Sequence, residues 1–118
     1  MIKKHAFSFK NALSGILWSL KTQTNFRTAL FLSLLSIAGG FVFQIAKIEF
    51  LIILAMIAVG LAIETINTAI EEAIDAIHKD WSDEIKVAKD VSAAAMLIFS
   101  VMAFIIACII FIPKIITL

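Results

Sequence analysis

Four polar residues with the chemistry of a catalytic or metal-binding site follow an apolar segment in the middle of the chain. They are Glu64, Asn67, Glu71 and Asp75. Their spacing places all of them on one face of a helix, within an arc of about 80°. Glu64 and Glu71 lie two turns apart, about 10 Å along the axis, so they do not form a close carboxylate pair that shares a proton. We call these four residues the acidic ladder.

The residue types of the acidic ladder suit phosphoryl transfer. Carboxylate and amide oxygens are ligands that Mg²⁺ prefers, and a glutamate at the edge of an apolar segment can act as a general base. Lys89 and Asp90 precede the next apolar segment at a similar depth, and a lysine there can bind a phosphate. Together these are the parts of a phosphoryl-transfer site that a membrane-bound alcohol could reach. A proton-coupled transporter could be built from the same parts.

Most of these residues also have a purely structural interpretation. Glu71 and Asp75 could simply face water at the solvated end of a helix. Asn67 could form a hydrogen bond between helices, and Lys89 could extend along the membrane interface to reach water. Glu64 is the exception, because the uncharged run 50–63 precedes it directly and an acid inside the membrane edge is usually functional or paired.

The composition places these groups in a membrane protein. Of the 118 residues, 62% are hydrophobic and 16% are charged, whereas soluble domains are about 45–50% apolar and about 25% charged. A chain this short has room for one domain, and a small soluble fold could not bury so much apolar surface. The single cysteine, Cys108, excludes an internal disulfide. A net charge of +1 supplies no field that would attract nucleic acid.

Uncharged runs and helical periodicity predict an all-α integral membrane protein, with an N-terminal amphipathic surface helix plus three transmembrane helices in a single membrane domain over 1–118. A helix needs about 20 apolar residues to cross the bilayer, and an apolar stripe beside lysines is typical of a helix in the membrane interface. The predicted bounds are about 4–22 for the surface helix and about 26–46, 49–79 and 83–112 for the spans, the second of which has a cytoplasmic extension. Asp80 or Ser82 is expected to cap the third span, and Pro113 is expected at its end.

The basic residues predict the orientation of the chain. Eight of the ten Lys and Arg residues, Lys3 and Lys4 among them, lie before the first span or between the second and third. Because positive charge gathers in cytoplasmic segments, the N-terminus and the second loop are expected in the cytoplasm and the C-terminus outside. The expected location is the bacterial cytoplasmic (inner) membrane.

The site residues resemble the signature of a known family. Glu64-Thr-Ile-Asn67-Thr-Ala-Ile-Glu71-Glu-Ala-Ile-Asp75, followed by Ala88-Lys89-Asp90, is similar to the pattern of the prokaryotic diacylglycerol kinase family, which includes the undecaprenol kinases. Asn25-Phe26-Arg27 extends the likeness towards the N-terminus. The resemblance implies a homotrimer whose active sites are shared between neighbouring subunits, ATP with Mg²⁺ as phosphoryl donor, and a lipid alcohol as acceptor.

The resemblance also implies a role for each site residue. Glu64 would take the proton from the lipid hydroxyl, and Glu71 would hold Mg²⁺. Nucleotide and phosphates would be positioned by Asn67, Asp75, Lys89 and Asp90. Gln23 stands where the family usually has a second metal-binding glutamate, and Ser92 stands where it often has glycine. A glutamine offers a neutral oxygen, so metal affinity is expected to fall unless another ligand compensates.

The expected function is an ATP-dependent lipid kinase that phosphorylates diacylglycerol or undecaprenol at the cytoplasmic interface. The sequence Ile-Asn-Thr-Ala-Ile-Glu over 66–71 is more similar to the undecaprenol-kinase branch. Two alternatives remain open from the sequence. Gln23 favours a weak or inactive family member that serves as a membrane interaction subunit. The lone acid within the hydrocarbon, Glu64, leaves room for a small proton-coupled transporter.

Overall fold

A computed structural model describes the backbone of residues 2–118 and the side chains from Ser8 onward. The described chain is helical throughout, with four helices and no strand: α1 (Ile2–Thr22), α2 (Thr24–Val42), α3 (Lys47–Ile77) and α4 (Asp83–Ile116). Three of these, α2, α3 and α4, are long and apolar enough to cross a membrane. The predicted all-α membrane architecture is thus confirmed, and the chain is a multi-pass membrane protein. Lys3 and Lys4, used to predict orientation, lie outside the described side chains.

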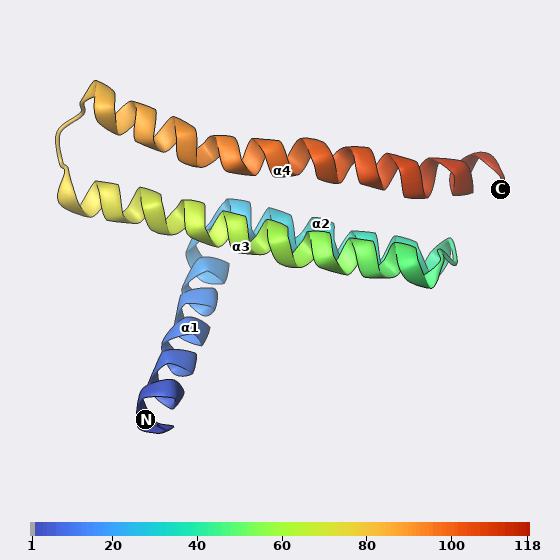
Figure 1. Ribbon diagram of the computed structural model, residues 1–118, viewed down its shortest axis with the longest axis horizontal. Helices are drawn as coiled ribbons and strands as arrows, with labels where there is room; N and C mark the ends of the chain where they lie inside the picture. The colour runs from blue at the N-terminus through green and yellow to red at the C-terminus, as the bar shows by residue number, and fades with distance from the viewer. Residues whose placement is uncertain (1) are drawn as a thin grey trace.

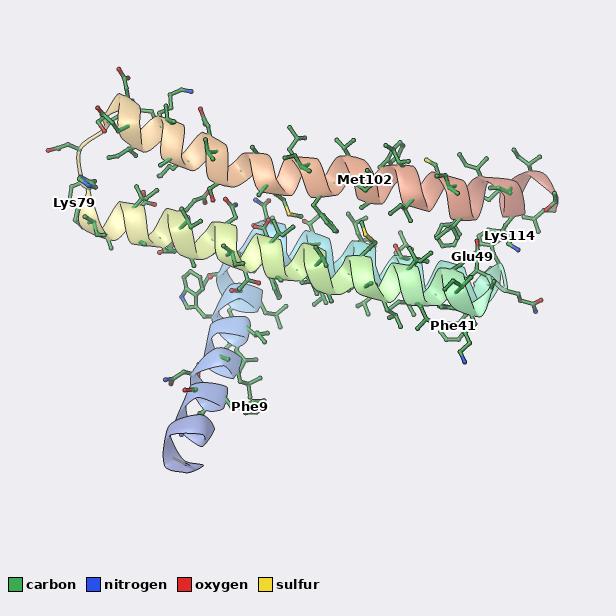
Figure 2. All side chains as sticks on the ribbon, in the orientation of Figure 1. Phe9, Phe41, Glu49, Lys79, Met102 and Lys114 are labelled. Atoms are coloured by element: carbon green, nitrogen blue, oxygen red, sulfur yellow. The ribbon has the colours of Figure 1, made fainter. Side chains whose placement is uncertain are left out.

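The three long helices run alongside one another, and α1 leaves them at a steep angle (Figure 1). Helix α3 lies between its neighbours, since it contacts both α2 and α4. The connection between α3 and α4 extends past the corner where α1 joins α2 (Figure 1). Figure 2 shows Lys79 at one end of the long helices and Glu49 and Lys114 at the other, with Met102 between them. This distribution leaves an apolar middle between two charged ends.

A single residue, Gln23, separates α1 from α2. The corner is held by Arg27, whose guanidinium donates hydrogen bonds to the carbonyl oxygens of Leu20 at 3.0 Å and Lys21 at 2.9 Å. Carbonyls in the last turn of a helix have no partner within that helix, so Arg27 supplies the missing donors. A second guanidinium nitrogen donates to the Thr24 hydroxyl at 3.3 Å. The angle between the two helices is therefore fixed by a side chain of α2.

The turn after α2 explains why that helix ends at Val42 rather than near the predicted residue 46. Gln44 adopts the left-handed backbone conformation, with φ of 52°. The Ile45 amide then donates to the Gly40 carbonyl at 3.1 Å, and the Gln44 amide donates to the Phe41 carbonyl at 3.3 Å. This pair of bonds is the Schellman arrangement, which ends a helix and satisfies its last carbonyls.

Helix α4 begins and ends on side-chain caps. The Ser82 hydroxyl accepts a hydrogen bond from the Ile85 amide at 3.3 Å, so of the two predicted caps Ser82 is the one that the structure uses. The prediction that Pro113 marks the end is wrong by one turn, because the helix continues to Ile116. The Thr117 hydroxyl donates to the Pro113 carbonyl at 2.9 Å, which satisfies an acceptor in this last turn.

Glycines permit the close approach of α3 to both neighbours. A Cβ atom added to Gly40 of α2 would lie 2.6 Å from Cε1 of Phe50 in α3. One added to Gly60 of α3 would overlap the ring of Phe99 in α4. Small residues at such contacts are typical of packing between membrane helices, where dispersion contacts take the place of the hydrophobic effect. The separation between α3 and α4 therefore depends on the absence of a side chain at Gly60.

We predict that Gly60→Val lowers the free energy of unfolding by about 1–3 kcal/mol, since two branched methyl groups cannot fit against Phe99 without moving α4. Gly15→Ala is the matched control, because a Cβ atom there meets nothing within 4 Å and alanine favours a helix by up to about 1 kcal/mol. Denaturant titration in detergent micelles, followed by circular dichroism, measures both. Equal effects at the two glycines would contradict the packing role of Gly60.

Candidate functional site

The acidic ladder lies on one face of α3 and runs from buried to exposed. Glu64 and Asn67 are 4% and 8% exposed. Glu71 is half-buried and Asp75 is exposed. Thr68 follows Glu64 by one turn of α3 and is buried as well. The ladder thus begins in the protein interior and ends in solvent.

The face that carries the ladder is turned towards α4. Three contacts establish this register: Gly60 against Phe99, Asn67 with Ser92, and Asp75 with Lys89. From the first contact to the third, the residue number rises in α3 and falls in α4, as in any antiparallel pair of helices. Because Glu64 and Glu71 share the face with these residues, the whole ladder borders the α3–α4 contact.

Lys89 contacts the exposed end of the ladder. Its ammonium donates a hydrogen bond to Asp75 Oδ1 at 2.6 Å. The two side chains are 30% and 59% exposed, and an ion pair so open to water contributes little to stability. A phosphate that enters the site can therefore replace Asp75 as the partner of Lys89 at a small cost in free energy.

A second, buried contact lies one turn deeper. The Ser92 hydroxyl donates to Asn67 Oδ1 at 2.6 Å. Sequence reasoning identified Ser92 only as a departure from a family pattern and gave it no role. The spacing could have indicated a role for Ser92, because Ser92 follows Lys89 by three residues and therefore shares its face of α4.

Asp90 lies apart from the ladder in this chain. It is exposed and accepts a hydrogen bond from Lys86, one turn earlier on α4, at 2.6 Å. Adjacent positions on a helix differ by about 100°, so Asp90 does not share the face of Lys89. An interaction of Asp90 with a nucleotide therefore requires a ligand that extends around α4.

Gln23 lies at the α1–α2 corner. Its backbone is extended, with φ of −105° and ψ of 110°, and it occupies the cap position of α2. Its side-chain amide donates to the Thr22 hydroxyl at 3.2 Å. None of the hydrogen bonds found between residues 8 and 118 joins Gln23 to the ladder. The structure thus leaves its carbonyl oxygen at the corner rather than among the acids.

The ladder offers single carboxylates and not a cage of metal ligands. Among the side chains from Ser8 onward, no group of three or more His, Cys, Asp and Glu residues could hold a metal ion. Mg²⁺ is usually bound through one or two carboxylates together with substrate phosphates and water, rather than in a cage of protein ligands. Half-buried Glu71, between the buried and exposed ends of the ladder, meets that requirement with one carboxylate.

Comparison with known proteins gives a family match over most of the chain. The family model described as prokaryotic diacylglycerol kinase matches residues 10–111. That range contains the acidic ladder, Lys89, Asp90 and Gln23.

Named relatives agree with the family match. An undecaprenol kinase of Bacillus subtilis is 35% identical over 107 residues, which cover 91% of this chain and 87% of the relative. A diacylglycerol kinase of Haemophilus influenzae is 30% identical over 91 residues, or 77% of either chain. A diacylglycerol kinase of Synechocystis is 26% identical over 112 residues, which cover 94% of this chain and 64% of the relative. The chain therefore belongs to the prokaryotic diacylglycerol kinase family and is a lipid kinase.

Proposed function

We propose that this protein transfers the γ-phosphoryl group of ATP to the hydroxyl of a membrane lipid alcohol at the cytoplasmic face of the bacterial inner membrane. The observation that carries this proposal is the position of Glu64. It is a buried carboxylate at the end of an apolar stretch of α3 and at the start of a polar face that reaches Lys89. A lipid hydroxyl can reach Glu64 from the hydrocarbon, while a nucleotide reaches the same face from water.

Glu64 is the general base in this proposal. Its carboxylate accepts the proton of the lipid hydroxyl as the hydroxyl oxygen bonds to the γ-phosphorus. The bond from the γ-phosphorus to the bridging oxygen of ATP breaks, and ADP leaves with that oxygen. The Thr68 hydroxyl, four residues later on the same side of α3, is close enough to orient the carboxylate by a hydrogen bond. General-base assistance of this kind contributes about 10²- to 10⁴-fold in rate.

The other site residues bind the donor. Lys89 exchanges Asp75 for a phosphate oxygen and neutralises negative charge, and Asn67 donates from its amide. Asp75 and Asp90 position the nucleotide. Glu71 would hold Mg²⁺, which when bound neutralises phosphate charge in the transition state. Gln23 lies at the α1–α2 corner of its own chain, so it would join the metal where the corner of one subunit meets the ladder of a neighbour.

A homotrimer with shared sites is part of the proposal. Buried hydrophobic residues in the described chain are few: Phe26, Ile45, Ile53 and Ile110. No large side chain of that part is completely buried. One chain therefore presents a polar face on α3 and little with which to enclose ATP and a lipid together. Neighbouring subunits would complete the enclosure.

The acceptor is proposed to be undecaprenol or diacylglycerol. The Bacillus subtilis relative is named an undecaprenol kinase and is 35% identical, whereas the two relatives named diacylglycerol kinases are 30% and 26% identical. This order supports undecaprenol as the first acceptor to assay. A panel of both alcohols, with products identified by mass spectrometry, decides between them.

We predict that Glu64→Gln lowers the rate of lipid phosphorylation by about 10²- to 10⁴-fold, because an amide cannot accept the proton of the hydroxyl. Purified protein in lipid vesicles, supplied with Mg-ATP and either alcohol, provides the assay. Glu72→Gln is the matched control, since Glu72 is exposed and lies to the side of the ladder. Full activity in Glu64→Gln would remove Glu64 as the base. Ion flux through the vesicles without ATP consumption would instead support a transporter.

We predict that Lys89→Met raises the KM for Mg-ATP by about tenfold or more, since a charged hydrogen bond to phosphate is lost. Lys114→Met is the control because Lys114 lies on the same helix at the end opposite to the ladder. The KM for the lipid alcohol should not change in either variant. A KM for Mg-ATP that responds equally at the two lysines would contradict the specific role of Lys89.

The neutral side chain of Gln23 favours one alternative, a family member with weak catalysis. We predict that Gln23→Glu lowers the Mg²⁺ concentration needed for half-maximal activity, because a carboxylate attracts a divalent cation more strongly than an amide does. Titration of activity against Mg²⁺ at fixed ATP measures the change. An identical titration in both proteins would remove Gln23 from the metal site, and with it the support for a weakened enzyme.

A further inference from the structure

Ser92 and Asn67 form a buried hydrogen bond between two helices. The Ser92 hydroxyl of α4 donates to Oδ1 of Asn67 in α3 at 2.6 Å. The residues are 9% and 8% exposed. The other side-chain bond between α3 and α4 in the described chain, from Lys89 to Asp75, is formed by more exposed groups, and so is the ion pair of Lys86 with Asp90. This bond is therefore shielded from water in a way that the ion pairs are not.

The contact lies between the proposed base and the proposed phosphate-binding lysine. Asn67 follows Glu64 by about one turn of α3, and Ser92 follows Lys89 by about one turn of α4. The α3–α4 register thus places the bond in the layer between the two functional ends of the site. A change in the orientation of the Asn67 side chain would alter the groups that this layer offers to a ligand.

A carboxamide is asymmetric, with an oxygen that only accepts and a nitrogen that only donates. Rotation by half a turn about its last bond exchanges the two ends. The hydrogen bond from Ser92 favours one of these orientations, because it uses Oδ1 as its acceptor. The NH₂ group is then the end left for a ligand, and a phosphate needs donors.

Resting on the function proposed above, we propose that Ser92 is a positioning residue, which holds the Asn67 carboxamide with its NH₂ group available to the phosphates of ATP. Alanine at position 92 would leave a buried carbonyl oxygen without its donor, and such a group is unfavourable when water cannot reach it. The carboxamide would then be free to rotate. The NH₂ group of Asn67 would then face the phosphate for only part of the time.

The first experiment measures steady-state kinetics in lipid vesicles. Ser92→Ala should raise the KM for Mg-ATP by about three- to tenfold, the range expected for one buried neutral hydrogen bond, and leave the KM for the lipid alcohol unchanged. Ser92→Thr, which keeps the hydroxyl, should restore the value of the unsubstituted protein. Ser100→Ala is the matched control, because Ser100 lies on the same helix and is exposed.

A double variant separates positioning from general damage to packing. If Ser92 acts through Asn67, Ser92→Ala should cause no further rise in KM when Asn67 is already alanine. Equal effects of Ser92→Ala with and without Asn67 would overturn the proposal. An unchanged KM for Mg-ATP in the single variant would overturn it as well.

A spectroscopic measurement tests the orientation without any substrate. The chain has three asparagines, Asn11, Asn25 and Asn67, and the first two are exposed. In protein labelled with ¹⁵N asparagine, the Asn67 NH₂ signals should shift and exchange faster with water in Ser92→Ala, but stay unchanged in Ser100→Ala. Unaltered Asn67 signals in Ser92→Ala would overturn the proposal.

Failure of the proposed function would be recognised separately. If the unsubstituted protein phosphorylates neither lipid alcohol, equilibrium dialysis with Mg-ATP replaces the KM measurement. A three- to tenfold higher dissociation constant in Ser92→Ala would support the role of Ser92, and an unchanged constant would overturn it.

Discussion

The polar groups on α3 can be buried within a membrane protein because α4 brings partners to the same layer. An unpaired polar group in hydrocarbon costs several kcal/mol. Asn67 avoids this cost through Ser92, and Asp75 is joined to Lys89 nearer the solvent. The antiparallel register of α3 and α4 is therefore the constraint on which the site depends. A shift of one helix by a single turn would separate both pairs together.

The same register depends on apolar packing deeper in the bilayer. Gly60 admits the ring of Phe99 where any side chain would push α4 away. Ser82 determines where α4 begins, and so which of its residues face the ladder. Arg27 holds α1 at the corner with α2. Local caps and glycines thus act on the site from some distance, although none of them carries its chemistry.

Periodicity was sufficient to predict much of this arrangement. Four helices, a single long α3 and a polar face on it follow from charge-free runs and helical spacing, because both signals are local in sequence. The spacing also placed Glu64 at the transition from apolar to polar residues, where the structure has a buried carboxylate. The sequence also placed Lys89 at a similar depth, and the family resemblance implied that it positions the nucleotide and phosphates.

The rest depends on contacts between helices, which spacing does not determine. The bond from Ser92 to Asn67 requires the register of α3 and α4, and the sequence alone leaves that register open. The end of α2 required a left-handed Gln44, a conformation that glycine or asparagine would have indicated more clearly. The extra turn beyond Pro113 required the cap from Thr117.

The single-residue joint at Gln23 makes the membrane surface a reference level for the site. If α1 lies in the interface, as its apolar stripe beside lysines predicts, α2 cannot slide along the bilayer normal without lifting α1 out of it, and α3 follows α2 through their glycine contact. A thicker or thinner bilayer is then accommodated at the opposite ends of the spans, where Gln44 and the last turn of α4 lie. Under the proposed function, the depth of Glu64 below the headgroups would then stay constant, and the enzyme would meet the hydroxyl of its lipid at one height in membranes of different thickness.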